Sequence, residues 1–287
     1  MGRSDVVPAP VLVVGAIASV QSGAAVAIKM FPAVGVGGAV LLRLVVSAAL
    51  LLALARPRVR GRSRPDLVLV VGFGLVLALM NCLFYLAIDR VPLGVGVTVE
   101  FLGPLGVAIV GSRRALDFGW ALLAAGGVAL LAGGNGRLDL AGIAFAAGAG
   151  ACWATYILVA QRVGRAFDGM TGLAIALGVG TVVLVPYGVI AGGRHLLRPS
   201  VLGKGAAVGV LSSAIPYSLE IAALRRLRAA VFGVLMSLEP AMAAMSGLVF
   251  LHQRLRWQEW ASVVAVMVAS IGAAADGGIA EPAEVLG

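Results

Sequence analysis

Three ionisable side chains, Arg43, Glu100 and Glu239, lie in the middle of long apolar stretches of this sequence. A charged side chain at the centre of a lipid bilayer costs roughly 2.5–3.5 kcal/mol on insertion scales, and such residues usually have a function. One role is structural, with Arg43 paired to a glutamate, although buried ion pairs often contribute little net stability. The other is functional, with the three side chains lining a wet cavity and binding the charged ends of a zwitterionic small molecule. We favour the functional role and keep the structural one open.

A proline follows each of the two glutamates closely. Pro104 comes four residues after Glu100, and Pro240 directly follows Glu239. A proline within a membrane helix leaves a backbone carbonyl without its helical partner and bends the helix. We expect Pro104 and Pro240 to act as hinges, with static kinks that improve packing as the alternative. A carboxyl group beside such a weakened turn can gain or lose a proton as the helix moves, so protons are the expected coupling ion.

Further polar and aromatic side chains also fall within apolar stretches. They are Gln21, Ser22, Asn81, Tyr85, Trp153, Tyr156, Tyr217 and Ser237. Asn81 and Tyr85 are four residues apart, and Trp153 and Tyr156 are three apart, so each pair shares one face of a helix. Tyrosine and tryptophan also anchor helices at membrane interfaces. We expect these two pairs and Tyr217 to lie deeper and to line the cavity.

Glu220 is a weaker candidate for the same cavity. It lies near the predicted end of a helix and close in sequence to Arg225, Arg226 and Arg228. An interfacial salt bridge with one of these arginines is the simpler interpretation.

The elements that position these side chains follow from the composition. Of the 287 residues, 61% are hydrophobic and only 12% are charged, and the mean hydropathy is +1.04. Soluble domains contain about 45–50% apolar and about 25% charged residues, so a water-soluble globule and a disordered chain are both excluded. At roughly 20 residues per span, membrane helices use up most of the chain and leave no room for a soluble catalytic domain. The predicted class is an all-α polytopic membrane protein.

Ten apolar runs predict ten transmembrane helices, with both chain ends on the same side of the membrane. The runs cover residues 9–29, 34–55, 66–89, 93–112, 115–133, 139–163, 169–193, 201–225, 229–251 and 257–276. The loops on the side of the chain ends carry thirteen basic residues against eight on the other side, which predicts both termini in the cytoplasm. We attribute the net charge of +9 to loops that face anionic lipids of the bilayer, and expect no nucleic-acid partner.

The two halves of the sequence are similar to each other. A shift of 136 residues places Pro104 on Pro240 and aligns seven identical residues over 25 positions, against roughly three expected from so biased a composition. We therefore expect two repeats of five helices each, at residues 1–136 and 137–287. Because five is odd, the second repeat enters the membrane from the opposite side, which gives an inverted repeat with a central cavity.

A membrane enzyme and a channel are the rival classes. His195 and His252 are the only histidines, and both lie in predicted outer loops without a metal-binding or catalytic partner motif. Inverted repeats with proline-interrupted helices favour alternating access over an open pore, and no Walker motif indicates ATP hydrolysis. The interpretation is a secondary transporter for a small-molecule substrate, with no catalytic residue, cofactor or metal ligand assigned and the oligomeric state left open.

Three segments carry a resemblance to a known family. They are RVPLGVGVTVEFLGPLG at residues 90–106, SAIPYSLE at 213–220 and FGVLMSLEPA at 232–241. They resemble the EamA-type transporters of the drug/metabolite transporter superfamily, most of all the threonine and homoserine exporter branch. The resemblance covers essentially the whole chain and implies export of small amino acids or related metabolites across the bacterial inner membrane, with a drug or other metabolite exporter as the alternative. The chain departs from the family pattern at residues 252–254, where a glutamate is often found.

The topology can be tested with reporter fusions. Fusions at both chain ends and in the loop between residues 56 and 64 are expected to report a cytoplasmic location, because that side has thirteen basic residues against eight. Changing the five arginines of this loop to glutamate is expected to weaken the preference. A periplasmic signal from the loop in the unaltered chain would overturn the orientation.

Overall fold

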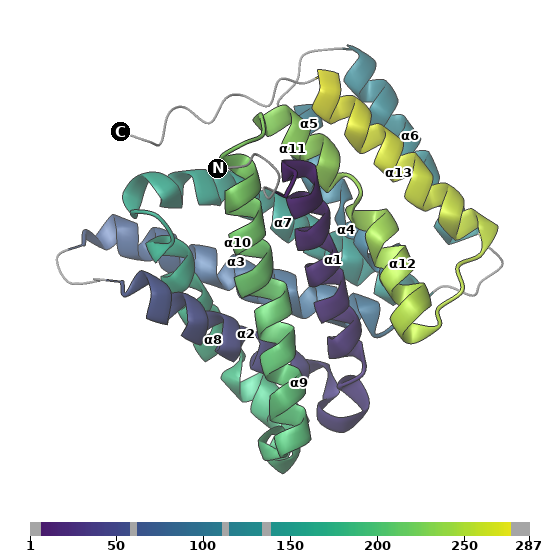
Figure 1. Cartoon of the computed structure of the whole chain (residues 1–287). Coiled ribbons are helices and arrows are strands. Elements are labelled where there is room, and N and C mark those ends of the chain that lie inside the picture. The colour runs from purple at the N-terminus through teal and green to yellow at the C-terminus, as the bar shows by residue number, and fades with distance from the viewer. Residues whose placement is uncertain (1–6, 58–61, 111–114, 134–138, 277–287) are drawn as a thin grey trace.

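The computed structural model describes residues 7–57, 62–110, 115–133 and 139–276, and this part of the chain consists of helices joined by short turns (Figure 1). The α-helices are α1 (Ala9–Ile28), α2 (Phe31–Ala55), α3 (Arg64–Ile88), α4 (Leu93–Glu100), α5 (Leu102–Val110), α6 (Ala115–Gly133), α7 (Leu140–Ala166), α8 (Thr171–Gly192), α9 (Pro199–Gly209), α10 (Ile215–Leu224), α11 (Ala229–Met236), α12 (Glu239–Leu251) and α13 (Trp257–Asp276). A 3₁₀-helix, η1 (Gly193–Leu197), precedes α9, and a π-helical turn, η2 (Val210–Ala214), follows it. The prediction of an all-α architecture is confirmed for the described residues.

Nine helical stretches within the described ranges are long and apolar enough to cross a membrane. They are Ala9–Ile28, Phe31–Ala55, Arg64–Ile88, Leu93–Val110, Leu140–Ala166, Thr171–Leu197, Pro199–Leu224, Val231–Leu251 and Trp257–Ala275. A further apolar helix, Leu116–Leu131, is shorter. The class of polytopic membrane protein is confirmed, whereas the count of ten spans and the inverted repeat remain predictions.

Three of the predicted spans are interrupted helices. The span that begins at residue 93 forms α4 and α5, with a break at Phe101. The span that begins at residue 229 forms α11 and α12, with a break at Ser237 and Leu238. The third interrupted span, in the second half of the chain, consists of α9 and α10 with the π-helical turn η2 between them. Apolar runs in the sequence predict where these spans lie but not that they are broken.

The breaks at Phe101 and at Ser237 each come just before a proline. Pro104 has no N–H to donate to the carbonyl of Glu100, and Pro240 has none for the carbonyl of Met236. Pro186 lies inside α8 without dividing it into two helices. A proline therefore permits a break, and the packing around it decides whether the helix divides.

Helices from distant parts of the sequence pair to form the bundle. α2 packs on α8, α3 packs on α7 and α8, and α6 packs on α13, and Figure 1 shows α6 and α13 side by side at one edge. The first helix, α1, contacts η2, α10 and α12, and the half-helix α4 contacts both α7 and α12. Each interrupted helix is thus covered by other helices, which keeps its free backbone groups away from lipid.

Contacts between loops define the two ends of the bundle. At one end, Arg62 lies 3.4 Å from the carboxylate of Asp168, which joins the turn before α3 to the turn after α7. At the other end, Arg90 lies 3.0 Å from the carboxylate of Asp139, which joins the turn after α3 to the start of α7. The hydrogen bond from Arg90 holds the pKa of Asp139 below its ordinary value.

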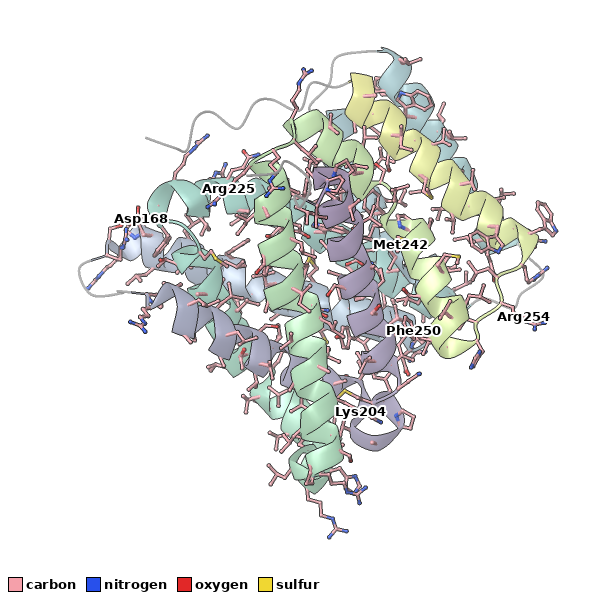
Figure 2. All side chains as sticks on the ribbon, viewed as in Figure 1. Asp168, Lys204, Arg225, Met242, Phe250 and Arg254 are labelled. Carbon is pink, nitrogen blue, oxygen red and sulfur yellow. The ribbon has the colours of Figure 1, made fainter. Side chains whose placement is uncertain are left out.

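Charged side chains gather at these two ends. Figure 2 places Asp168 and Arg225 toward one end of the bundle, and Lys204 and Arg254 toward the other. This arrangement agrees with the predicted alternation of loops, in which Arg225 and Lys204 lie on opposite sides of the membrane. Which end faces the cytoplasm remains a prediction.

Candidate functional site

Glu100 and Glu239 lie at the two helix breaks and are both buried. Glu100 is the last residue of α4, and Glu239 is the first residue of α12. Only 8% of each residue is exposed, so both carboxylates are directed into the bundle. Because Pro104 and Pro240 interrupt the two helices, the predicted hinge prolines also determine where the carboxylates enter the interior.

A side chain from α1 binds the Glu239 carboxylate. The Nε2 group of Gln21 donates a hydrogen bond to Oε1 of Glu239 over 3.1 Å, and only 2% of Gln21 is exposed. Oε1 of Gln21 and Oε2 of Glu239 are also buried, and neither has a hydrogen-bond partner among the described residues. This contact joins the first helix of the chain to α12. The sequence pattern marks Gln21 as a polar residue in a span but gives it no partner.

Arg43 contacts a tyrosine in place of a carboxylate. Its Nη1 atom donates a long hydrogen bond of 3.5 Å to the hydroxyl of Tyr85, and its guanidinium carbon lies 5.5 Å from the centroid of the Tyr85 ring. Among the described residues, no ion pair within 4.0 Å joins Arg43 to Glu100 or Glu239. Tyr85 therefore orients a guanidinium that shares the interior with the carboxylates.

Glu220 does not form the ion pair that its sequence neighbours suggest. It is half-buried, and the structure, which describes all three arginines at 225–228, contains no ion pair between them and Glu220. The predicted interfacial salt bridge is therefore absent. Glu220 lies in α10, three residues after Tyr217. Its place follows from the packing of α10 on α1, which the sequence alone does not give.

Asn81 and Tyr85 share a buried face of α3, as their spacing predicts. They are 5% and 0% exposed. The amide nitrogen of Asn81 donates to the carbonyl of Leu77 over 2.8 Å, within its own helix. Its donor is therefore already satisfied, whereas the Tyr85 hydroxyl is used to bind Arg43.

The predicted aromatic residues of α7 and α10 are packed within the bundle. Trp153 meets Phe101, the residue at the α4–α5 break, edge to face at a centroid distance of 5.7 Å. Tyr156 stacks on Phe73 of α3 at 5.1 Å, and Tyr217 is half-buried beside the same core. α7 thus places one aromatic residue at the break near Glu100 and another against α3.

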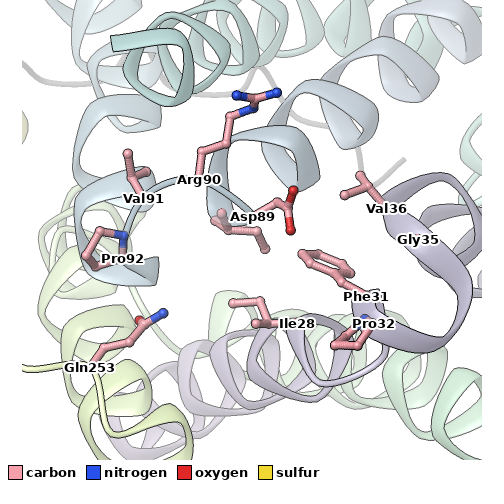
Figure 3. A pocket seen from close by; sticks show the side chains of 11 residues that line it. Ile28, Phe31, Pro32, Gly35, Val36, Asp89, Arg90, Val91, Pro92 and Gln253 are labelled. Atoms are coloured by element: carbon pink, nitrogen blue, oxygen red, sulfur yellow. The ribbon is translucent and has the colours of Figure 1, made fainter. Parts of the chain in front are cut away.

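A cavity of about 600 Å³ opens at the end of the bundle that carries Arg90, as Figure 3 shows. It lies between the end of α1, the start of α2, the end of α3 and the start of α4. Asp89 and Phe31 both reach toward it. Gln253 closes one side, since its side-chain oxygen accepts a hydrogen bond from the backbone N–H of Leu93 over 2.9 Å. Gln253 lies in the loop where the sequence departs from the family pattern, and this loop caps α4.

Phe31 forms the inner wall of this cavity. Its ring centroid lies 5.8 Å from that of Tyr85, which in turn contacts Arg43. Gly35 interrupts the regular conformation of α2 one turn later, with a φ of 65° that strongly favours glycine. Phe31 thus links the wall of the cavity to Tyr85 and, through Tyr85, to Arg43. The sequence analysis missed Phe31 and Gly35, because an apolar run gives no signal for a distorted turn inside it.

The chain is similar to known membrane transporters. Residues 140–274 match the EamA-like transporter family. The threonine/homoserine exporter RhtA of Salmonella typhimurium strain LT2 is 46% identical over 261 residues, which are 90% of this chain and 88% of that exporter. The exporter of the same name from Escherichia coli strain K12 is 45% identical over 266 residues, 91% of this chain and 90% of its own. A solved crystal structure has a similar fold, with a TM-score of 0.61 at 19% identity over 93% of this chain and 95% of the other.

The contact between Arg43 and Tyr85 predicts energetic coupling between them. In a double-mutant cycle with Arg43→Gln and Tyr85→Phe, we expect a coupling free energy of about 0.5–1.5 kcal/mol, because either single variant removes the hydrogen bond between the guanidinium and the hydroxyl. Thermal unfolding in detergent measures it. The Tyr187→Phe variant removes a hydroxyl from a 39% exposed tyrosine and serves as the control. Additive effects of Arg43→Gln and Tyr85→Phe would contradict the contact.

Proposed function

The chain belongs to the EamA-like transporter family, and we propose that it exports small amino acids such as threonine and homoserine across the bacterial inner membrane. The observation that carries this proposal is the 46% identity, over 90% of this chain, to a protein named as a threonine/homoserine exporter. Nine apolar helical stretches in the described ranges supply the membrane domain that such a transporter needs. Export of a drug or another metabolite remains the alternative within the same superfamily.

The interior supplies both charges that a zwitterionic amino acid requires. We assign the guanidinium of Arg43, oriented by Tyr85, to the substrate carboxylate, because arginine presents several donors in a fixed plane. We assign the carboxylates of Glu100 and Glu239 to the substrate ammonium group. Both partners lie within the bundle, where a low dielectric strengthens each charge contact.

We also include in the proposed site the four uncharged residues predicted for it. Asn81, Trp153, Tyr156 and Tyr217 come from three helices that pack around the breaks. They are assigned to the walls of the cavity, where they exclude lipid and shape the space left for the substrate side chain.

Alternating access through an inverted repeat is the transport mechanism we propose. The breaks before Pro104 and Pro240 occur at equivalent positions of the two proposed repeats, residues 1–136 and 137–287. The shorter apolar helix Leu116–Leu131 is taken as the tenth span. A rocking movement of one repeat against the other would open the central cavity to each side in turn.

The cavity bounded by Phe31 supports this mechanism. It opens at the end of the bundle that the charge bias assigns to the periplasm, and Phe31 in its wall contacts Tyr85, which in turn contacts Arg43. We interpret it as the outer vestibule of a closed outer gate. Gly35 lies one turn beyond Phe31 and provides the local backbone freedom for Phe31 to move.

Proton coupling follows from the chemistry of the buried glutamates. A carboxylate that binds an ammonium group must be charged, whereas the same group crosses a dry membrane more readily when neutral. Protons entering the cell could therefore drive amino acids out through Glu100 or Glu239. Both termini are placed in the cytoplasm in this proposal.

Counterflow in proteoliposomes tests the substrate. Vesicles that contain the purified protein and are loaded with unlabelled threonine are expected to accumulate labelled threonine and homoserine, because exchange needs no ion gradient. A panel of other amino acids, nucleotide sugars and cationic drugs measures specificity. Protein-free vesicles are the control, and accumulation of a cationic drug with no amino-acid exchange would favour the alternative function.

Glutamine variants separate proton coupling from substrate binding. Glu100→Gln and Glu239→Gln keep the size of the side chain but fix it as neutral. If a glutamate carries only the proton, its glutamine variant is expected to retain exchange and to lose transport driven by a pH gradient. If a glutamate binds the substrate, its glutamine variant is expected to raise the half-saturating substrate concentration at least about tenfold, which corresponds to about 1.4 kcal/mol of binding free energy. Wild-type behaviour of both variants in both assays would show that the glutamates are structural.

A further inference from the structure

The hydrogen bond between Gln21 and Glu239 leaves two acceptor oxygens without partners. Gln21 uses its only donor group, Nε2, to bind Oε1 of Glu239 at 3.1 Å. Its own Oε1 atom and Oε2 of Glu239 are both buried and make no hydrogen bond among the described residues. Because 98% of Gln21 and 92% of Glu239 are buried, these oxygens are shielded from bulk solvent.

Two buried acceptors beside each other require a donor. Unsatisfied polar groups are rare in protein interiors, and each one calls for a physical explanation, such as strain, a functional role, or a bound water, ion or ligand. One of the two oxygens belongs to a carboxylate, so a positively charged donor satisfies both the hydrogen-bonding capacity and the charge. Calcium and magnesium ions take six or more oxygen ligands, and zinc prefers histidine and cysteine ligands, so two oxygens alone do not match these metal ions. An ammonium group, with its three N–H bonds, fits two such acceptors.

We propose that Gln21 is a substrate-binding residue whose side-chain oxygen, together with Oε2 of Glu239, holds the ammonium group of the transported amino acid. This inference rests on the proposed function and deepens it. It assigns the ammonium group to the α1–α12 contact and leaves the substrate carboxylate to Arg43.

The surroundings of Gln21 hold it in place for this role. Ser19, two residues earlier, donates to the carbonyl of Leu211 in η2 over 2.7 Å. Gly23, two residues later, lies so close to η2 that a Cβ atom there would come within 2.5 Å of the Ser212 hydroxyl. Residues two apart on a helix point in nearly opposite directions. The contacts of Ser19 and Gly23 with η2 therefore turn Gln21 toward α12.

The position of Glu239 in its helix favours the same assignment. Glu239 lies in the first turn of α12, where the free N–H groups and the helix dipole stabilise a negative charge. Glu100 lies at the C-terminal end of α4, where the dipole has the opposite sign. Of the two glutamates, Glu239 is thus the better partner for a permanent cation.

The site would select for amino acids over hydroxy acids. A hydroxy acid carries a hydroxyl in place of the ammonium group, so it offers one donor and no charge to the two oxygens. Sites built to hydrogen-bond a substrate group reject analogues that lack it, because the buried protein groups are then left unpaired. Threonine and its hydroxy-acid analogue, 2,3-dihydroxybutyrate, form a matched pair of probes.

The test measures how well unlabelled threonine and 2,3-dihydroxybutyrate each inhibit threonine counterflow in proteoliposomes. For the unaltered chain we expect threonine to inhibit at a concentration at least about 100-fold lower than the hydroxy acid. The Gln21→Met variant keeps the length of the side chain but removes both polar atoms. We expect it to raise the half-saturating threonine concentration about tenfold and to reduce the ratio between the two probes by a similar factor.

A matched control and a second variant complete the design. Thr181→Val removes a part-buried side-chain hydrogen bond, from Thr181 to the carbonyl of Leu177, in α8, which carries none of the proposed site residues, and it is expected to leave the ratio unchanged. Gln21→Asn withdraws the amide by one carbon, and if Gln21→Met does not fold, this variant is expected to lower the ratio in the same assay.

The outcomes separate this inference from the proposed function. An unaltered ratio in a folded Gln21 variant, or equal losses for both probes, would contradict the role of Gln21. So would equal inhibition of the unaltered chain by the two probes. Absence of amino-acid counterflow in the unaltered chain would instead overturn the proposed function.

Discussion

The absence of water inside the bilayer is the constraint on which this structure depends. Every backbone N–H and C=O group in the membrane needs a partner from the chain itself, which is why the described residues form helices. The breaks at Phe101 and at Ser237 and Leu238 interrupt that pattern. They are tolerated because α7 and α12 cover α4, while α1 and α13 cover α11. The same covering buries Glu100 and Glu239, so the breaks and the charges depend on each other.

Much of the fold can be predicted from the sequence, because long apolar runs occur where the chain crosses the lipid bilayer. The spans and the alternation of loops between two ends follow from it. The interruptions do not, as Pro104 and Pro186 illustrate: both are prolines in apolar runs, yet only Pro104 follows a break. The difference lies in tertiary packing around each helix. The distorted turn at Gly35 and the π-helical turn η2 cannot be predicted from the sequence for the same reason.

The site can be predicted in part. Glu100, Glu239 and Arg43 are recognisable because a charge in an apolar stretch is costly. Their partners are not recognisable, since a partner is chosen by geometry between distant helices. Arg43 contacts the hydroxyl of Tyr85, although a glutamate was an expected partner. Glu220 is half-buried and forms no ion pair with the arginines that follow it in the sequence. An uncharged polar residue such as Gln21 costs less free energy in a membrane span than a charged residue does. Its position in the sequence alone therefore does not distinguish a binding residue from a packing residue.

The two proposed repeats are alike in their breaks but differ in their charges. The shift of 136 residues that matches Pro104 with Pro240 places Met236 opposite Glu100 and Gly103 opposite Glu239. Steric packing explains the second difference: a Cβ atom at residue 103 would collide with the backbone carbonyl of Gly150 in α7, so no glutamate fits there. The first half therefore carries its carboxylate one turn earlier. Two repeats of similar sequence would thereby enclose an asymmetric interior, and an amino acid, whose two ends carry opposite charges, requires an asymmetric site.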